Sequence, residues 1–152
     1  MNNYFLKQRT AELLGYAGLL PFCALSIACW LVHPDWLGTF IQGQLAYGIA
    51  ILSFLGGIHW GAALMSTTLS EQRSKKALLW SVVPALIAWM STMVGGVRLA
   101  VLMLGFIAAY QVDKRLFAWY GVPEWFIGLR FRLTCVVVAA LALTIWAAMV
   151  RG

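Results

Sequence analysis

Long apolar stretches separated by short polar breaks run through the whole chain. The apolar stretches cover residues 11–32, 45–66, 77–94, 99–112 and 133–150. Because a membrane helix needs about 20 mostly apolar residues, the pattern predicts an all-α membrane protein. We expect a bundle of five transmembrane helices in one domain, residues 1–152. The stretch 99–112 is the shortest, and a re-entrant segment is the alternative for it.

The longest polar break, residues 113–132, ends in the run "RLFAWYGVPEWFIGLRFR", which mixes aromatic and basic side chains. Aromatic rings with a polar edge suit the headgroup level of a bilayer. We therefore expect an interfacial segment on the cytoplasmic face, between the fourth and fifth helices and broken at Gly121 and Pro123. A surface for a protein partner would have a similar composition.

The basic residues are distributed unevenly between the two sides that five crossings would create. With a cytoplasmic N-terminus, the inner side holds Lys7, Arg9, Arg73, Lys75, Lys76, Lys114, Arg115, Arg130 and Arg132, and the outer side holds Arg98 and Arg151. Cytoplasmic loops of membrane proteins carry an excess of lysine and arginine. The distribution therefore predicts a cytoplasmic N-terminus, an outside C-terminus and a crossing by residues 99–112.

The composition supports a lipid environment. Hydrophobic residues make up 62% of the chain and charged residues 11%, with a mean hydropathy of +0.84, whereas about a quarter of a soluble domain is charged. The net charge of +6 is spread between apolar stretches, which favours membrane lipids over nucleic acid as the partner. Lys7 and Arg9 precede the first stretch as in a signal peptide, but its length favours an uncleaved helix.

Small residues and prolines predict how the helices pack. Ser53, Gly57 and Gly61 follow one another at four-residue spacing, which gives one helix face a flat groove for another helix. We expect an internal contact of the bundle, with dimerisation as the alternative. Pro21 and Pro84 lie inside the first and third stretches, and each is expected to kink its helix.

His59 lies inside the second stretch, in the segment "FLGGIHWGAAL". An ionisable residue within a membrane span is a functional hypothesis by default, although a neutral histidine can also serve a structural role. Small residues, Gly56 among them, share its helix face, so a helix or ligand could approach the ring. A structural role, a ligand contact and proton transfer all remain open. We expect the ring to find a hydrogen-bond partner on the fourth or first helix.

Three further residues could join His59 around a lipophile such as a quinone. A quinone site needs an apolar slot with one or two hydrogen-bonding groups, and Trp60, Tyr110 and Gln111 could supply them.

Two charged residues of the break between the last two stretches, Asp113 and Arg130, are candidates for ion pairs. We expect Asp113 in a solvated ion pair with the adjacent Lys114 or Arg115. Arg130 is expected to contact anionic headgroups, Asp113 or Glu124.

The sequence contains no motif typical of catalysis or metal binding. It has no carboxylate dyad, nucleophile–base pair, phosphate loop or HExxH motif. The three cysteines lie in apolar stretches without a CxxC pair, so they are expected to act as small hydrophobic residues. His33 and His59 lie at different depths, which argues against a haem held by both. We predict no cofactor apart from a quinone-like lipophile, and the question of enzyme activity stays open, with the balance against it.

Several segments together resemble a known family. They are "LGYAGLLPF", "YGIAILSFLGGIHWG", "WSVVPALIAW" and "VPEWFIGLRFRLT". They are similar to a domain-of-unknown-function family of small bacterial membrane proteins that includes mitochondrial transmembrane protein 69. The resemblance covers nearly the whole chain and implies an integral inner-membrane protein of bacteria or mitochondria, and for this chain we expect the bacterial cytoplasmic (inner) membrane. It supplies no catalytic residues, but it directs attention to His59, Trp60, Asp113 and Arg130.

These observations lead to one principal hypothesis and two alternatives. The principal hypothesis is an inner-membrane binding or accessory protein, whose partner is another membrane protein or a second copy of the chain. The first alternative is a protein that binds a quinone-like lipophile at His59. The second is a small transporter, which is disfavoured because no carboxylate is expected deep in a span.

Overall fold

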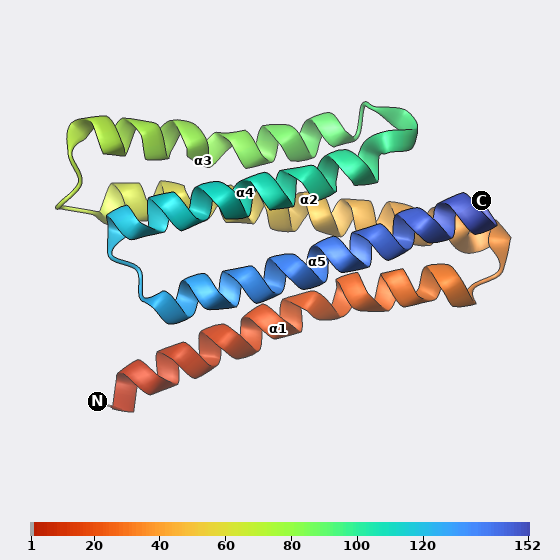
Figure 1. Cartoon of the computed structure of the whole chain (residues 1–152), viewed down its shortest axis with the longest axis horizontal. Coiled ribbons are helices and arrows are strands. Elements are labelled where there is room, and N and C mark those ends of the chain that lie inside the picture. The colour runs from red at the N-terminus through yellow and green to blue at the C-terminus, as the bar shows by residue number, and fades with distance from the viewer. Residues whose placement is uncertain (1) are drawn as a thin grey trace.

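The computed structural model describes the backbone of residues 2–152 and the side chains from residue 7 onward, and all regular structure in this part is helical. The helices are α1 (Asn2–Leu31), α2 (Pro34–Met65), α3 (Glu71–Ser91), the short 3₁₀ helix η1 (Gly95–Val97), α4 (Arg98–Tyr120) and α5 (Glu124–Arg151). The prediction of an all-α protein with five long helices is therefore confirmed (Figure 1).

Four of these helices are long and apolar enough to cross a membrane. They are α1 from Lys7 onward, α2, α4 together with η1, and α5. α3 does not meet the same criterion, because its first two turns carry Glu71, Arg73, Lys75 and Lys76. α4 has 23 residues, so the fourth helix is longer than the apolar stretch that predicted it.

The interfacial segment expected between the fourth and fifth helices is not present as a separate element. α4 continues to Tyr120 and α5 begins at Glu124, so only residues 121–123 lie between them. Gly121 has a φ of +69° and ends α4 in the left-handed conformation that glycine tolerates, and Pro123 is the residue before α5. The polar side chains of this segment do not end a helix. The interruption between α4 and α5 comes from Gly121 and Pro123. The predicted break at residues 33–44 is likewise helical from residue 34 onward, since α2 begins at Pro34 and His33 is its N-cap.

Consecutive helices run antiparallel, so α1, α3 and α5 point one way along the bundle and α2 and α4 point the other way (Figure 1). α3 packs against α2 and α4, and α1 packs against α5 and α2. The chain's N-terminus lies at the same end as the α2–α3 and α4–α5 connections, which we call the N-terminal end of the bundle. The C-terminus lies at the opposite end, with the α1–α2 and α3–α4 connections, which we call the C-terminal end.

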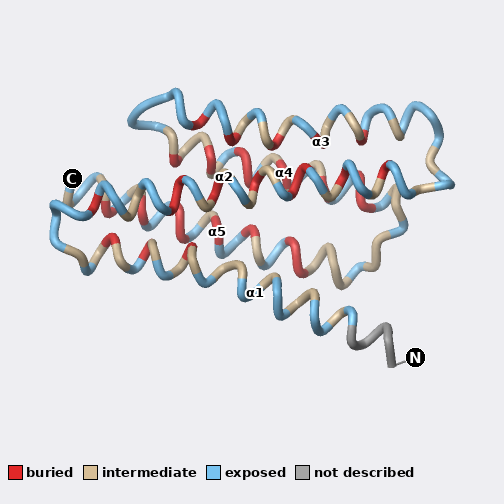
Figure 2. Tube along the Cα trace, turned by 180° about the vertical axis from the view of Figure 1, so that it is seen from behind, coloured by how far each residue is buried: buried red, intermediate tan, exposed pale blue. Residues whose placement is uncertain are grey.

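The core lies along α2 and α4, in the middle of the bundle (Figure 2). Phe22 of α1 meets Phe106 of α4 edge-on, with ring centroids 5.8 Å apart. Buried polar groups also join helices. Ser26 of α1 donates to the carbonyl of Ala140 at 3.0 Å, and Gln44 donates to the carbonyl of Phe22 at 3.2 Å. Such bonds and close packing hold helices together where lipid surrounds them.

The small residues of α2 pack differently from the prediction. Gly57 and Gly61 are exposed and a Cβ on either would meet no other atom within 4 Å, and the hydroxyl of Ser53 bonds to its own helix at Ile49. The expected internal contact through this stripe is therefore wrong. The close contact of α2 with a neighbouring helix is at Gly56 instead, because a Cβ there would collide with the Ser81 carbonyl of α3. Neighbouring residues on a helix point about 100° apart, so Gly56 and Gly57 face different surroundings.

The two prolines lie where the sequence placed them, inside continuous helices. Pro84 is buried and lies beside the Gly56 contact between α2 and α3. Near Pro21, α2 donates two hydrogen bonds to α1 carbonyls, one from Gln44 to Phe22 and one from Tyr47 to Gly18 at 2.8 Å. These bonds are the kind that stabilise a proline-containing membrane helix.

Candidate functional site

His59 belongs to a buried network that joins three helices. Its Nε2 lies 2.5 Å from Oδ1 of Asp113 on α4, and its Nδ1 lies 3.1 Å from the hydroxyl of Tyr120, also on α4. Arg130 of α5 donates to Oδ2 of Asp113 from Nη2 at 2.6 Å and from Nε at 3.1 Å. We call His59, Asp113, Tyr120 and Arg130 the charged cluster.

The charged cluster is inside the bundle and close to its N-terminal end. The relative exposure is 0% for His59, 2% for Asp113 and 5% for Arg130. His59 and Asp113 stand six and seven residues before the ends of their helices, and Arg130 six residues after the start of α5. At 1.5 Å per residue, the three side chains start at roughly the same depth, about 10 Å from the helix ends.

The geometry assigns a hydrogen-bonding role to each group. Asp113 accepts both nitrogens of Arg130 on one oxygen and the Nε2–H of His59 on the other. In the neutral tautomer with hydrogen on Nε2, Nδ1 of His59 accepts the hydroxyl hydrogen of Tyr120. The carboxylate and the guanidinium then balance each other's charge, which is what a buried pair requires.

Aromatic rings enclose the histidine. Phe117 stacks on His59 with centroids 5.2 Å apart and an interplanar angle of 22°, and Phe126 of α5 packs on Phe117 at 5.4 Å. The cluster is therefore shielded by side chains of the same helices that supply it.

The expectation of a solvated ion pair for Asp113 is wrong. Asp113 faces the interior, while the neighbouring Lys114 is exposed and lies over the ring of Tyr110 at 5.5 Å. The reason is the extension of α4 past residue 112, which places Asp113 on the helix face that carries Ala109 and Leu116. Contact of Arg130 with Asp113 was one of the predicted alternatives, and the expected contact of His59 with the fourth helix is present.

The other predicted companions of His59 are not in its network. Trp60 is 49% exposed, Gln111 is exposed, and Tyr110 lies against the ring of Phe131 with centroids 5.6 Å apart. Gln111 is two residues before Asp113, so it points about 200° away from it. The quinone slot predicted around His59, Trp60, Tyr110 and Gln111 is therefore not assembled.

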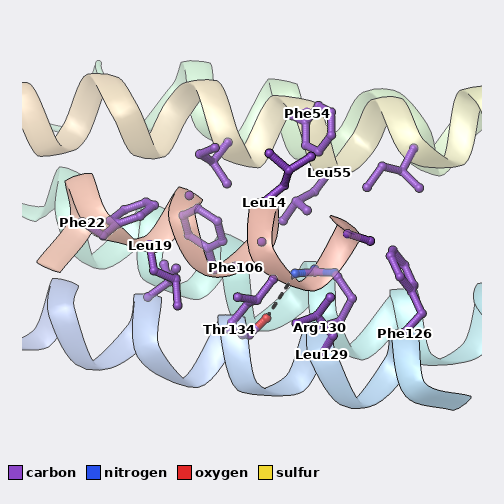
Figure 3. Close-up of a pocket in the computed structure, with 17 residues that line it drawn as sticks. Leu14, Leu19, Phe22, Phe54, Leu55, Phe106, Phe126, Leu129, Arg130 and Thr134 are labelled. Carbon is purple, nitrogen blue, oxygen red and sulfur yellow. Dashed lines mark hydrogen bonds between the residues drawn. The ribbon is translucent and has the colours of Figure 1, made fainter. Parts of the chain in front are cut away.

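A mainly apolar cavity of about 440 Å³ lies beside the charged cluster (Figure 3). Its lining residues are Ala11, Leu14, Gly15, Gly18, Leu19 and Phe22 of α1, Ile51, Phe54, Leu55 and Ile58 of α2, Phe106 of α4, and Phe126, Leu129, Arg130, Leu133, Thr134 and Val137 of α5. Arg130 and Thr134 are the polar members, and Nη1 of Arg130 lies 3.5 Å from Oγ1 of Thr134. His59 does not line the cavity, so Arg130 links the cavity to the histidine.

Sequence reasoning missed two contributors, Tyr120 and Thr134. Tyr120 follows Asp113 by seven residues, which is two turns of one helix, and Thr134 follows Arg130 by four, which is one turn. Both spacings would have placed them on the right faces if residues 113–132 had been assigned to helices. Among the described residues, no group of three or more His, Cys, Asp or Glu side chains could hold a metal ion.

Comparison with known proteins gives a consistent family and no activity. The family model described as "Protein of unknown function (DUF3429)" matches residues 7–146. Transmembrane protein 69 of Xenopus tropicalis is 36% identical over 141 residues, which is 88% of this chain and 52% of that protein. Transmembrane protein 69 of Mus musculus is 28% identical over 130 residues, 85% of this chain and 52% of that protein.

This chain spans about half the length of these curated relatives. No solved structure matches it. The family match covers α2, α3 and α4 completely and α1 and α5 except for their outer ends, and it includes all members of the charged cluster. The chain belongs to this family of proteins of unknown function, DUF3429, and is a membrane protein related to transmembrane protein 69.

Proposed function

We propose that this protein is a multi-pass inner-membrane binding protein that holds a lipophilic small molecule in the cavity between α1, α2 and α5. The observation that carries the proposal is the cavity itself. It combines an apolar lining with a polar wall from Arg130 and Thr134, which is the composition typical of small-molecule sites. Leu14 and Phe54, which line it, are also exposed on the side of the bundle, so a molecule could enter from the lipid.

The proposed topology has five crossings with a cytoplasmic N-terminus. α3 lies along α2 and α4 between the two ends of the bundle (Figure 1), which supports a fifth crossing despite its charged start. With Arg130 left aside, eight of the remaining basic residues lie toward the N-terminal end and two, Arg98 and Arg151, toward the C-terminal end. The positive-inside rule then puts the N-terminal end in the cytoplasm and the charged cluster in the inner half of the membrane.

A cavity-filling variant tests the binding role. Gly18 lines the cavity, and a Cβ added there meets only the hydroxyl of Tyr47, at 3.9 Å. Gly18→Leu should therefore fill the cavity without forcing the helices apart. Gly57→Leu is the matched control, because Gly57 lies in an apolar helix, outside the cavity, with nothing within 4 Å.

The measurement is native mass spectrometry of protein extracted gently from its own membranes. We expect the natural protein and Gly57→Leu to retain a bound lipophile, and Gly18→Leu to lose it. Equal adducts of bulk phospholipid on all three proteins, with no other small molecule, would contradict the proposal.

An accessory role in a membrane complex is the second candidate. It is supported by the exposed positions Gly57 and Gly61 of α2, which leave a smooth helix surface without a neighbour in this chain. Recovery of a stoichiometric membrane protein in the same extraction, lost in Gly57→Leu and kept in Gly18→Leu, would favour this role. Recovery of a second copy of the chain would favour self-association.

A further inference from the structure

The polar wall of the cavity consists of two neighbouring side chains on α5. Arg130 and Thr134 stand one helical turn apart, and both line the same cavity (Figure 3). The other lining residues are glycines or apolar side chains. A molecule in the cavity can therefore form side-chain hydrogen bonds only at this wall.

Both groups have hydrogen atoms left to donate. Nε and Nη2 of Arg130 are committed to Asp113, whereas Nη1 has only the 3.5 Å contact with Thr134. Thr134 accepts in that contact, so its own hydroxyl hydrogen remains available. Thr144 of the same helix differs, because its hydroxyl donates to the carbonyl of Ala140 at 3.0 Å. The wall thus offers mainly donors, since its one remaining acceptor position is the second lone pair of the Thr134 hydroxyl.

The charges around the wall are already balanced. Arg130 and Asp113 form a pair with Nη2 and Oδ2 2.6 Å apart, and a neutral His59 with its hydrogen on Nε2 satisfies both of its hydrogen bonds without adding a charge. A carboxylate or phosphate in the cavity would add a second anion with no unused counter-charge, and an unpaired buried charge is costly. A neutral acceptor would use the same donors without that penalty.

We infer that the molecule in this cavity carries a neutral carbonyl group, as in a ketone, an ester or a quinone, which accepts hydrogen bonds from Nη1 of Arg130 and Oγ1 of Thr134. This inference rests on the proposed binding function and specifies the chemistry of the ligand's polar head. The carbonyl lies at the wall and the apolar remainder contacts the lining of α1 and α2.

The test uses the fluorescent naphthyl ketone Prodan, titrated into the protein in detergent micelles and corrected with protein-free micelles. Prodan emission shifts to longer wavelength when its carbonyl accepts hydrogen bonds. The shift therefore reports whether the carbonyl is hydrogen-bonded, and the titration gives the affinity of Prodan for the protein. Competition then uses three probes of similar tail length: 2-tridecanone, tridecane and dodecanoate.

We expect Thr134→Val to weaken Prodan about 3- to 10-fold, which corresponds to the loss of one hydrogen bond, and to reduce the emission shift. Thr144→Val should change neither, because the Thr144 hydroxyl is satisfied within α5. 2-Tridecanone should compete at least about tenfold more strongly than dodecanoate or tridecane.

Two results separate the inference from the proposed function. If Gly18→Leu abolishes Prodan binding but Thr134→Val has no effect, or dodecanoate competes best, the cavity binds lipophiles and the neutral-carbonyl inference is overturned. If Gly18→Leu leaves Prodan binding unchanged, the binding function itself fails, and the inference with it.

Discussion

Each end of the bundle contains one arginine of α5, and the two arginines bind different kinds of partner. At the N-terminal end, Arg130 is buried and paired with a carboxylate that also holds His59. At the C-terminal end, Arg151 is half-buried and donates to the backbone carbonyls of Cys29 and Val32, at 2.5 Å each. The two arginines are 21 residues apart on one helix, which is about 30 Å and close to the thickness of a bilayer's hydrocarbon core.

The difference follows from how deeply each arginine lies in the bundle. Arg151 lies in the last turn of α5 and can use the partial negative charge at the end of α1. Arg130 lies inside the bundle, where a full counter-charge is needed. The N-terminal end therefore carries a closed hydrogen-bonded network of four side chains around the Arg130–Asp113 ion pair, and the C-terminal end carries a helix cap.

The largest effect is expected for Asp113→Leu. The substitution leaves Arg130 buried without a counter-charge and removes the acceptor of His59, so it should destabilise the protein by about 3–5 kcal/mol. Thermal unfolding in detergent micelles would measure the loss. An unchanged midpoint would show that the network is not formed as described.

A smaller effect is expected for His59→Leu. Asp113 keeps Arg130, but it loses one donor and Tyr120 loses its partner, so the expected destabilisation is about 1–3 kcal/mol. His33→Asn is the control, because His33 is exposed at the C-terminal end and asparagine can replace it as the N-cap of α2. Equal effects of the two substitutions would argue against a special role for His59.

The smallest effect is expected for Arg151→Met. The substitution removes a helix cap near the surface and leaves no buried charge, so the expected loss is about 1 kcal/mol. The ratio between this effect and that of Asp113→Leu, measured in the same micelles, quantifies the contrast between the two ends. A larger loss for Arg151→Met than for Asp113→Leu would reverse it.

The helices could be predicted from the sequence better than their ends. Apolar length locates all five, but the mixed charged and aromatic residues 113–120, expected in a surface segment, continue α4. A helix end depends on backbone signals, here Gly121 and Pro123, and not on polarity. The same error placed Asp113 in water, because the helix face it shares with Ala109 could not be followed past residue 112.

The candidate site could be predicted only in part. Burial of His59 and its contact with the fourth helix followed from small neighbours and from the cost of an unpartnered polar group in lipid. The identity of its partners did not follow, because which faces of α2, α4 and α5 meet depends on how the helices pack. The contrast between Gly56 and Gly57 has the same origin, since two adjacent small residues are equally suited to packing until a neighbour selects one.

The most direct test of the charged cluster is a double-mutant cycle on Asp113 and Arg130. The natural protein, Asp113→Leu, Arg130→Leu and the double variant would be compared by their free energies of unfolding in detergent. If the two residues form one neutral buried pair, each single variant is strongly destabilised and the double variant is more stable than either, since it buries no unpaired charge. If the two losses simply add, the pair is not coupled and the account of the N-terminal end is wrong.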